Sequence, residues 1–129
     1  MPLCLVVEDH RDTRDGYLEF LGFAGFTVMG ATGRDEMLSR LADATPDAII
    51  MDLQLPGTDG WTIIRELRKS TQTTHVPIVV VSASVRESDR VQAVQAGCDV
   101  FLPKPCDPSI IVAEIQRLIG RRIDHEPSV

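Results

Sequence analysis

The sequence predicts an α/β fold in which five parallel strands alternate with five helices, a doubly wound (βα)5 sandwich. One observation is that five short apolar runs alternate with segments whose apolar residues recur at helical spacing. A second is that the runs at 3–7 and 48–51 are apolar at every position, the pattern of strands buried on both faces of a parallel sheet. The 129 residues fit one domain, expected over residues 1–121 with a flexible tail at 122–129.

The expected elements alternate strictly, strand first. They cover residues 3–7, 11–24, 26–29, 34–43, 48–51, 60–69, 78–81, 86–96, 100–102 and 108–121. In the first helix Tyr17 and Leu21 recur at helical spacing, and Phe20 widens the apolar stripe. The second strand is short and partly alternating, as expected at a sheet edge. Met37 and Leu38 predict the inner face of the second helix.

The second half of the chain repeats the alternation. Ile63 lies on the inner stripe of the third helix, and the strand that follows it is the most β-branched run of the chain. The fourth helix is weakly amphipathic through Val91 and Val94, so we expect it to pack least firmly. Asp107 and Pro108 are the residues preferred at the N-cap and first position of a helix, and they begin the fifth.

Composition and charge exclude several function classes. The net charge of −6 argues against a nucleic-acid surface, because phosphate contacts need clustered Lys and Arg. No apolar run approaches the length of a membrane span, and the N-terminus lacks the basic flank of a secretory signal. Three irregularly spaced cysteines fit neither a disulfide framework nor a paired-thiol zinc site. We therefore expect a cytoplasmic protein with neither nucleic acid nor membrane as partner.

Polar side chains stand where the predicted strands end. Glu8 and Asp9 follow the first strand, Asp52 the third, Ser82 the fourth and Lys104 the fifth. Because right-handed crossovers bring the carboxyl ends of all parallel strands to one edge, these five residues are expected to converge there.

The convergence favours a magnesium site suited to phosphoryl transfer. Carboxylates at one edge repel each other, and Lys104 together with a divalent cation would offset that charge. Oxygen ligands without a His or Cys cluster favour Mg²⁺. Asp52 would then be the nucleophile, while Ser82 and Lys104 would share the charge of the phosphoryl oxygens.

Each of these residues also has an ordinary structural interpretation. Asp52 alone could cap the turn that follows its strand, and Ser82 could cap the next helix. Glu8 and Asp9 could be helix N-terminal acids. His10, beside these acids, is interpreted as a loop residue rather than a ligand. For the residues other than His10, the order of the motifs along the chain favours the functional interpretation over the structural one.

Over residues 3 to about 120 the chain resembles the receiver domain of two-component response regulators. The resemblance is carried by short motifs in a fixed order, each weak alone. They are Val7-Glu8-Asp9, Pro46-Asp47, Met51-Asp52-Leu53, Leu55-Pro56-Gly57, Asp59-Gly60, Val76-Pro77-Ile78, Val81-Ser82-Ala83, Ala96-Gly97-Cys98-Asp99 and Phe101-Leu102-Pro103-Lys104-Pro105. Ser82 replaces the commoner Thr, and Cys106 stands where a bulkier apolar residue is usual; both leave the chemistry intact.

The resemblance implies a flavodoxin-like sheet of order 2-1-3-4-5 and a role for each residue of the site. Glu8, Asp9, Asp52 and the backbone carbonyl of Gln54 would hold Mg²⁺. Asp52 would be phosphorylated by a sensor histidine kinase or a histidine phosphotransfer protein. The chain would catalyse only its own phosphorylation and a slow autodephosphorylation, so it would not be an enzyme acting on another substrate.

The resemblance also implies a switch. Ser82 and Lys104 would bind the phosphoryl oxygens, and Phe101 would change rotamer. A cis peptide bond before Pro105 would aim the Lys104 amine into the site. Phosphorylation would then alter the face made by the fourth helix, the last strand and the fifth helix. That face would meet an output protein or a second copy of the chain.

Three other functions are alternatives to a phosphorylation-controlled switch. A hydrolase with an aspartyl nucleophile usually carries a second acid two residues after it, and here that position is Gln54. A nucleotide or flavin binder needs a glycine-rich loop after the first strand, where this chain has Glu8 and Asp9. A pseudo-receiver that acts only as an interaction module stays open as the alternative. So does the question whether the chain stands alone or belongs to a longer protein.

Overall fold

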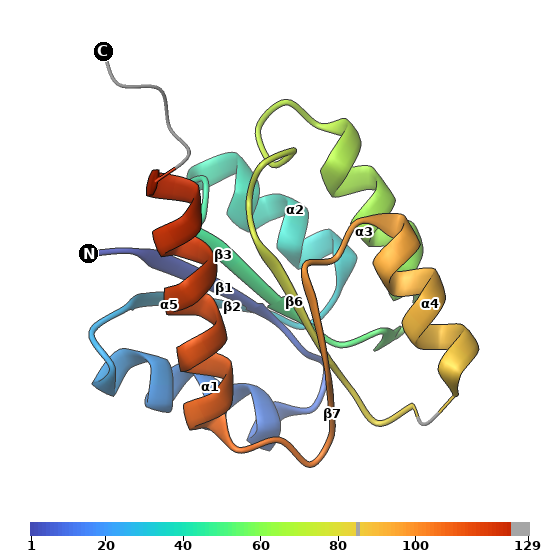
Figure 1. Ribbon diagram of the computed structural model, residues 1–129, viewed down its shortest axis with the longest axis horizontal. Helices are drawn as coiled ribbons and strands as arrows, with labels where there is room; N and C mark the ends of the chain where they lie inside the picture. Colours follow the sequence, from blue (N-terminus) through green and yellow to red (C-terminus); the bar gives the residue numbers. More distant parts are fainter. Residues whose placement is uncertain (85, 125–129) are drawn as a thin grey trace.

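The computed structural model describes residues 1–84 and 86–124, and it has the predicted α/β architecture (Figure 1). Five parallel strands form one sheet in the order β2-β1-β3-β6-β7, which is the expected order 2-1-3-4-5. The elements are β1 (Leu3–Val7), α1 (Arg11–Phe23), β2 (Thr27–Ala31), α2 (Arg34–Asp43), β3 (Ala48–Met51), β4 (Gln54–Leu55), β5 (Thr58–Asp59), α3 (Gly60–Lys69), β6 (Ile78–Ser82), α4 (Glu87–Ala96), β7 (Val100–Pro103) and α5 (Pro108–Asp124).

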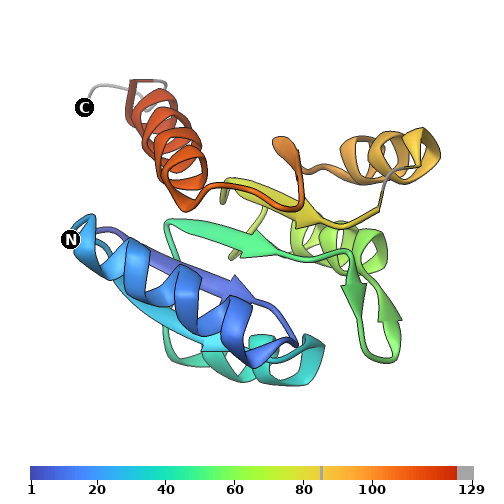
Figure 2. The ribbon, with the colours of Figure 1, turned by 90° about the horizontal axis from the view of Figure 1, so that it is seen from below.

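The helices cover both faces of the sheet (Figure 2). Side chains that alternate along each strand contribute to two separate cores. On one face Tyr17 and Leu21 of α1 and Ile115 of α5 pack against Val6 and Val79. On the other face α2, α3 and α4 pack against the intervening strand residues. The latter core includes Leu5, Val7, Met37, Ile49, Met51, Ile63, Ile64, Val80 and Ala93. Among the described helices, none combines the length and apolarity that a membrane span requires.

The sheet register aligns the ends of the strands. Val7, the last residue of β1, lies opposite Ala31 on one side and Met51 on the other, and each of these is the last residue of its own strand. Ser82 likewise lies opposite Pro103 at the ends of β6 and β7. The residues that follow these strands therefore emerge together at one edge of the sheet.

Between the expected third strand (48–51) and third helix (60–69), where no regular element was expected, the chain forms a small antiparallel hairpin of β4 and β5. Gln54 pairs with Asp59 and Leu55 with Thr58, and Gly57 takes the positive φ of 76° that the tight connection needs. The edge strand β2 also begins one residue later and ends two residues later than expected, because it pairs with β1 along its whole length. Helix α5 continues to Asp124, beyond the expected end near Arg121, and residues 125–129 of the expected tail lie outside the described part.

Several side chains expected on inner helix faces are exposed. The predictions for Phe20 (39% exposed) and Leu38 (41%) were wrong, because the sheet contacts only the narrower stripes through Leu21 and Met37. In α4 the buried residues are Ala93 and Ala96, whereas Val91 and Val94 face outward. Helix α4 thus presents small side chains to the core, and the stripe expected through Val91 and Val94 was wrong.

Candidate functional site

The site begins with the backbone, which continues the sheet by one residue past three strand ends. The continuing bonds run from Glu8 N–H to the Ala31 carbonyl oxygen (2.9 Å), from Asp52 N–H to that of Val7 (3.1 Å) and from Lys104 N–H to that of Ser82 (2.8 Å). Glu8, Asp52 and Lys104 are therefore held by the same ladder that holds the core, and their side chains meet at the edge of the sheet.

Lys104 bridges two buried carboxylates. Its Nζ donates to Asp52 Oδ2 at 2.9 Å and to Glu8 Oε2 at 3.0 Å, and both acids are almost fully buried. Burial by itself would lower the pKa of Lys104, but the hydrogen bonds to Asp52 and then to Glu8 outweigh it and raise this pKa. The amine therefore stays charged and offsets part of the local negative charge.

The second oxygen of Asp52 is fixed by the turn into the hairpin. Asp52 Oδ1 accepts a hydrogen bond from the Gln54 N–H at 3.0 Å, while the Gln54 residue itself is exposed. One carboxylate oxygen thus contacts a backbone amide and the other an ammonium group. Both oxygens of the candidate nucleophile are therefore held in place by hydrogen-bond donors.

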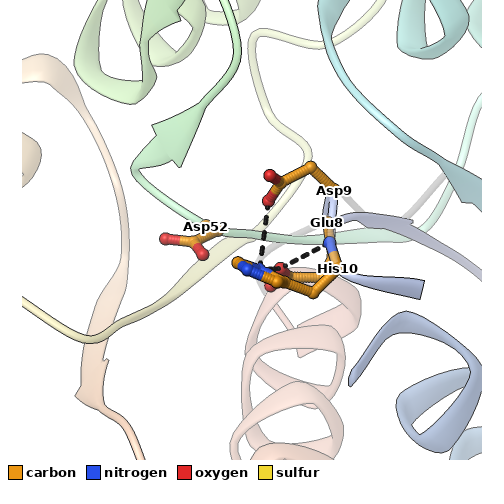
Figure 3. A group of neighbouring side chains, drawn as sticks. All are labelled: Glu8, Asp9, His10 and Asp52. Carbon is orange, nitrogen blue, oxygen red and sulfur yellow. Dashed lines mark hydrogen bonds and ion pairs between the residues drawn. The ribbon is translucent and has the colours of Figure 1, made fainter. Parts of the chain in front are cut away.

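Asp9 and His10 complete the cluster at its exposed side (Figure 3). His10 Nδ1 lies 3.1 Å from Glu8 Oε1 and 3.4 Å from Asp9 Oδ1. Asp9 Oδ1 is shielded from solvent and has no hydrogen-bond partner among the described residues. One donor atom from each of Glu8, Asp9, His10 and Asp52 lies within 4.8 Å of every other.

This donor set fits a hard divalent cation. Three carboxylates converge on one point, and a buried oxygen without a partner is costly unless something positive binds it. Glu8, Asp9 and Asp52 are the carboxylates able to hold such an ion, because each offers an oxygen to the cluster and Lys104 binds neither Glu8 Oε1 nor Asp9 Oδ1. The geometry thus brings together the three acids expected from the sequence.

The remaining predicted residues lie around this cluster. Ser82 is fully buried, and its Oγ accepts a hydrogen bond from the Ser84 N–H at 3.2 Å rather than capping α4, whose N-cap is Arg86. Phe101 is half-buried in β7, opposite Val80, and packs against the core on the side of α4. The peptide bond between Lys104 and Pro105 is cis.

Sequence reasoning gave no role to Arg14. Its Nη1 donates to the carbonyl oxygens of Glu8 (2.9 Å) and Asp9 (3.5 Å). It thereby joins α1 to the backbone of the segment that carries the two acids. The signal that could have revealed it is a basic residue one turn into the helix that follows the acids. It also offsets part of the charge that the acids share.

The comparisons with known proteins agree with this fold and site. The family model "Response regulator receiver domain" matches residues 4–116, and the chain belongs to that family. Among curated relatives, the "Transcriptional regulatory protein BaeR" of Escherichia coli is 33% identical over 120 residues, which are 93% of this chain and 49% of BaeR. The chain thus spans about half the length of these curated relatives.

Solved structures extend the comparison. A CheY-like receiver domain protein from Methanospirillum hungatei superposes with a TM-score of 0.91 at 20% identity, covering 98% of this chain and 99% of that one, and so shares the fold. The receiver domain of sensor histidine kinase PA1611 from Pseudomonas aeruginosa is 30% identical with a TM-score of 0.79, over 92% and 98% of the two chains. That structure has a magnesium ion coordinated in its active site cleft. This chain is therefore a receiver domain of the response-regulator class with an acidic pocket.

Proposed function

We propose that this receiver domain is phosphorylated on Asp52 with Mg²⁺ as cofactor, and that it thereby switches a partner-binding surface. The observation that carries the proposal is the buried Asp52 carboxylate, held by Lys104 at 2.9 Å beside two further acids. Family membership and the magnesium-bound PA1611 receiver domain support the same function. The phosphoryl donor would be a phosphohistidine on a sensor histidine kinase or a histidine phosphotransfer protein.

The residues divide the work of the transfer. An oxygen of the Asp52 carboxylate attacks phosphorus as the bond from phosphorus to the donor imidazole breaks, and the electron pair leaves with the imidazole nitrogen. Glu8, Asp9, Asp52 and the Gln54 carbonyl would hold Mg²⁺, which would supply neutralising charge for the phosphoryl oxygens. Lys104, whose Nζ already contacts Asp52, redirects a hydrogen bond to one of these oxygens.

The switch follows from the new charge. The Ser82 hydroxyl stands at the end of β6 beside the site, and it would turn to donate to a phosphoryl oxygen. The half-buried Phe101 would then move inward and change the surface of α4, β7 and α5. That surface would contact an output partner or a second copy of the chain. Because several curated relatives are named as transcriptional regulatory proteins, the expectation that nucleic acid is no partner applies only to this domain.

The proposal is tested by intact-mass spectrometry after incubation with acetyl phosphate, with and without Mg²⁺. Wild type and the control Asp59→Asn, which alters an exposed acid of the hairpin, should each gain one phosphoryl group only when Mg²⁺ is present. Asp52→Asn should gain none. No gain in wild type, together with no Mg²⁺ binding by calorimetry, would favour a pseudo-receiver that serves as an interaction module.

A further inference from the structure

The imidazole of His10 is placed as a metal ligand would be. Its Nδ1 lies 3.1 Å from Glu8 Oε1 and 3.4 Å from Asp9 Oδ1, between the two acids and facing Asp52 (Figure 3). Two ligands bound at about 2.1 Å and at right angles to each other are about 3.0 Å apart. The two separations from Nδ1 are therefore close to those between neighbouring ligands on one cation.

The partners of these atoms support the same interpretation. Asp9 Oδ1 is buried and accepts no hydrogen bond from the described residues, and Lys104 contacts the other oxygen of Glu8. The backbone N–H of His10 also donates to Glu8 Oε1 at 3.2 Å, which holds the His10 backbone close to that carboxylate. His10 precedes α1 as its N-cap, yet its side chain makes no capping hydrogen bond, so helix capping does not explain the orientation of the ring.

An imidazole changes which cation the site prefers. An all-oxygen donor set suits Mg²⁺, whereas a nitrogen donor favours the later first-row divalent metals. We propose that His10 Nδ1 is a fourth side-chain ligand of this site and gives it a preference for a first-row transition cation such as Co²⁺ over Mg²⁺. The inference rests on the proposed function only in using the same acids as ligands.

The competing explanation is an ordinary hydrogen bond. His10 is 71% exposed on its side chain, and a protonated Nδ1 donating to Glu8 would give the same 3.1 Å separation. As a ligand, Nδ1 must instead present its lone pair, with the proton on the outward Nε2. Measuring metal binding distinguishes an Nδ1 that donates a hydrogen bond from an Nδ1 that binds the cation.

The test is calorimetric titration of the intact chain with Co²⁺ and with Mg²⁺, for wild type, His10→Ala and the control His75→Ala. His75 is exposed and lies far from the acids in the sequence, so it reports adventitious binding by a surface imidazole. His10→Ala should weaken Co²⁺ binding at least about tenfold, since even indirect partners of a ligand cost about that much. It should change Mg²⁺ affinity less than about twofold, because Mg²⁺ readily keeps a water in that position.

A spectroscopic readout makes the assignment direct. Mn²⁺ bound to wild type and to His75→Ala should show nitrogen-14 modulation in its electron spin echo, and Mn²⁺ bound to His10→Ala should not. If wild type and His10→Ala bind Co²⁺ equally and neither shows nitrogen modulation, the role of His10 is overturned while the proposed magnesium site stands. If wild type binds none of the three ions, both proposals fall, and Asp52→Asn would then match wild type in every titration.

Discussion

At the scale of single residues, the site concentrates charge that the fold has to stabilise. Glu8 and Asp52 are buried, Asp9 lies beside them, and the Lys104 ammonium group donates a hydrogen bond to each of the two buried carboxylates. Three carboxylates against one ammonium leave net repulsion at this edge of the sheet. This repulsion lowers the stability of the folded protein, and removing one of the three acids should restore part of that stability.

We predict that Asp9→Asn stabilises the protein in the absence of divalent cations. The change keeps the size of the side chain and removes one negative charge, so the free energy of unfolding should rise by about 1 kcal/mol at low ionic strength and by less at high salt. Added Mg²⁺ should stabilise the variant less than wild type, because one ligand has lost its charge. Urea unfolding at two salt concentrations, with and without Mg²⁺, measures all three effects.

The matched control is Asp35→Asn. Asp35 is fully exposed in the first turn of α2, and its replacement changes the net charge equally. Its effect should stay within about 0.5 kcal/mol, as for most surface substitutions. Equal stabilisation by both variants would mean that total charge matters rather than the cluster.

The residues of the cluster could be predicted from the sequence because each directly follows a strand, and parallel topology decides where strand ends lie. The position of His10 could not be predicted in the same way. Whether a loop side chain turns toward the acids or toward solvent depends on backbone dihedrals, here φ −76° and ψ 116°. Arg14 was missed for a related reason, since its contacts are to backbone carbonyls that no sequence pattern marks.

At the scale of elements, the hairpin β4–β5 is joined tightly to α3 through one glycine. The Gly60 N–H donates to the Leu53 carbonyl oxygen at 2.9 Å, and a Cβ on Gly60 would lie 2.5 Å from Leu53 Cα. Since that neighbour is backbone, it cannot rotate away. Leu53 follows Asp52 directly, so this contact also helps to set the turn in which Asp52 Oδ1 meets the Gln54 amide.

We predict that Gly60→Ala lowers the free energy of unfolding by about 1–3 kcal/mol, the usual cost of overpacking. Gly16→Ala is the opposite case, because Gly16 lies exposed within α1 and its Cβ would meet nothing within 4 Å. It should stabilise by about 0.5–1 kcal/mol, since alanine loses less backbone entropy in a helix. Urea midpoints of the two variants give the comparison, and changes of the same sign would contradict it.

The existence of the helices could be predicted more completely than the faces they bury. Apolar periodicity predicts which stripe of a helix faces the sheet, but the width of the buried stripe depends on how neighbouring helices share the sheet surface. Phe20 and Leu38 lie beyond the buried stripes and are exposed. Contacts between elements were also beyond the sequence pattern. Arg68 of α3, for example, donates to the Gly97 and Val76 carbonyl oxygens and to Asp99, and thereby joins α3 to α4 and β6.

At the scale of the whole molecule, the order of the strands in the sheet could be predicted from the sequence. The cores on either side of the sheet bury two thiols, to which the sequence pattern assigned no role. Cys4 is fully buried in the central strand β1. Burial, and then the negative charge of Asp47, raise the pKa of Cys4 to about 12, and burial raises that of Cys98 to about 11. Both thiols stay neutral in the folded protein where an unfolded chain would ionise them.

We predict that the protein loses stability from pH 8 to pH 10. An unfolded thiol releases its proton near the ordinary pKa of 9.0, while folded Cys4 keeps its proton to about 12, so the unfolded state binds fewer protons. The free energy of unfolding then falls as pH rises, by about 1.4 kcal/mol per thiol at pH 10. Lys104 adds no pH dependence in this window, because the stability that its raised pKa contributes is fully present below the ordinary pKa of 10.5 and is lost only above it.

The measurement compares urea unfolding of wild type and Cys4→Ala at pH 8, 9 and 10. The variant starts lower because of the small cavity it leaves, so the informative quantity is the change with pH rather than the value at pH 8. That change should shrink by about 1.4 kcal/mol over the range in Cys4→Ala. Cys106→Ala, which removes the more exposed thiol, should reduce the loss of stability between pH 8 and pH 10 by a smaller amount. The pKa of a thiol nearer solvent differs less between the folded and unfolded states. If the free energy of unfolding fell equally with pH in wild type and Cys4→Ala, the Cys4 thiol would be ionising in the folded protein below pH 10. Strand β1 would then be less protected from solvent than its central place in the sheet implies.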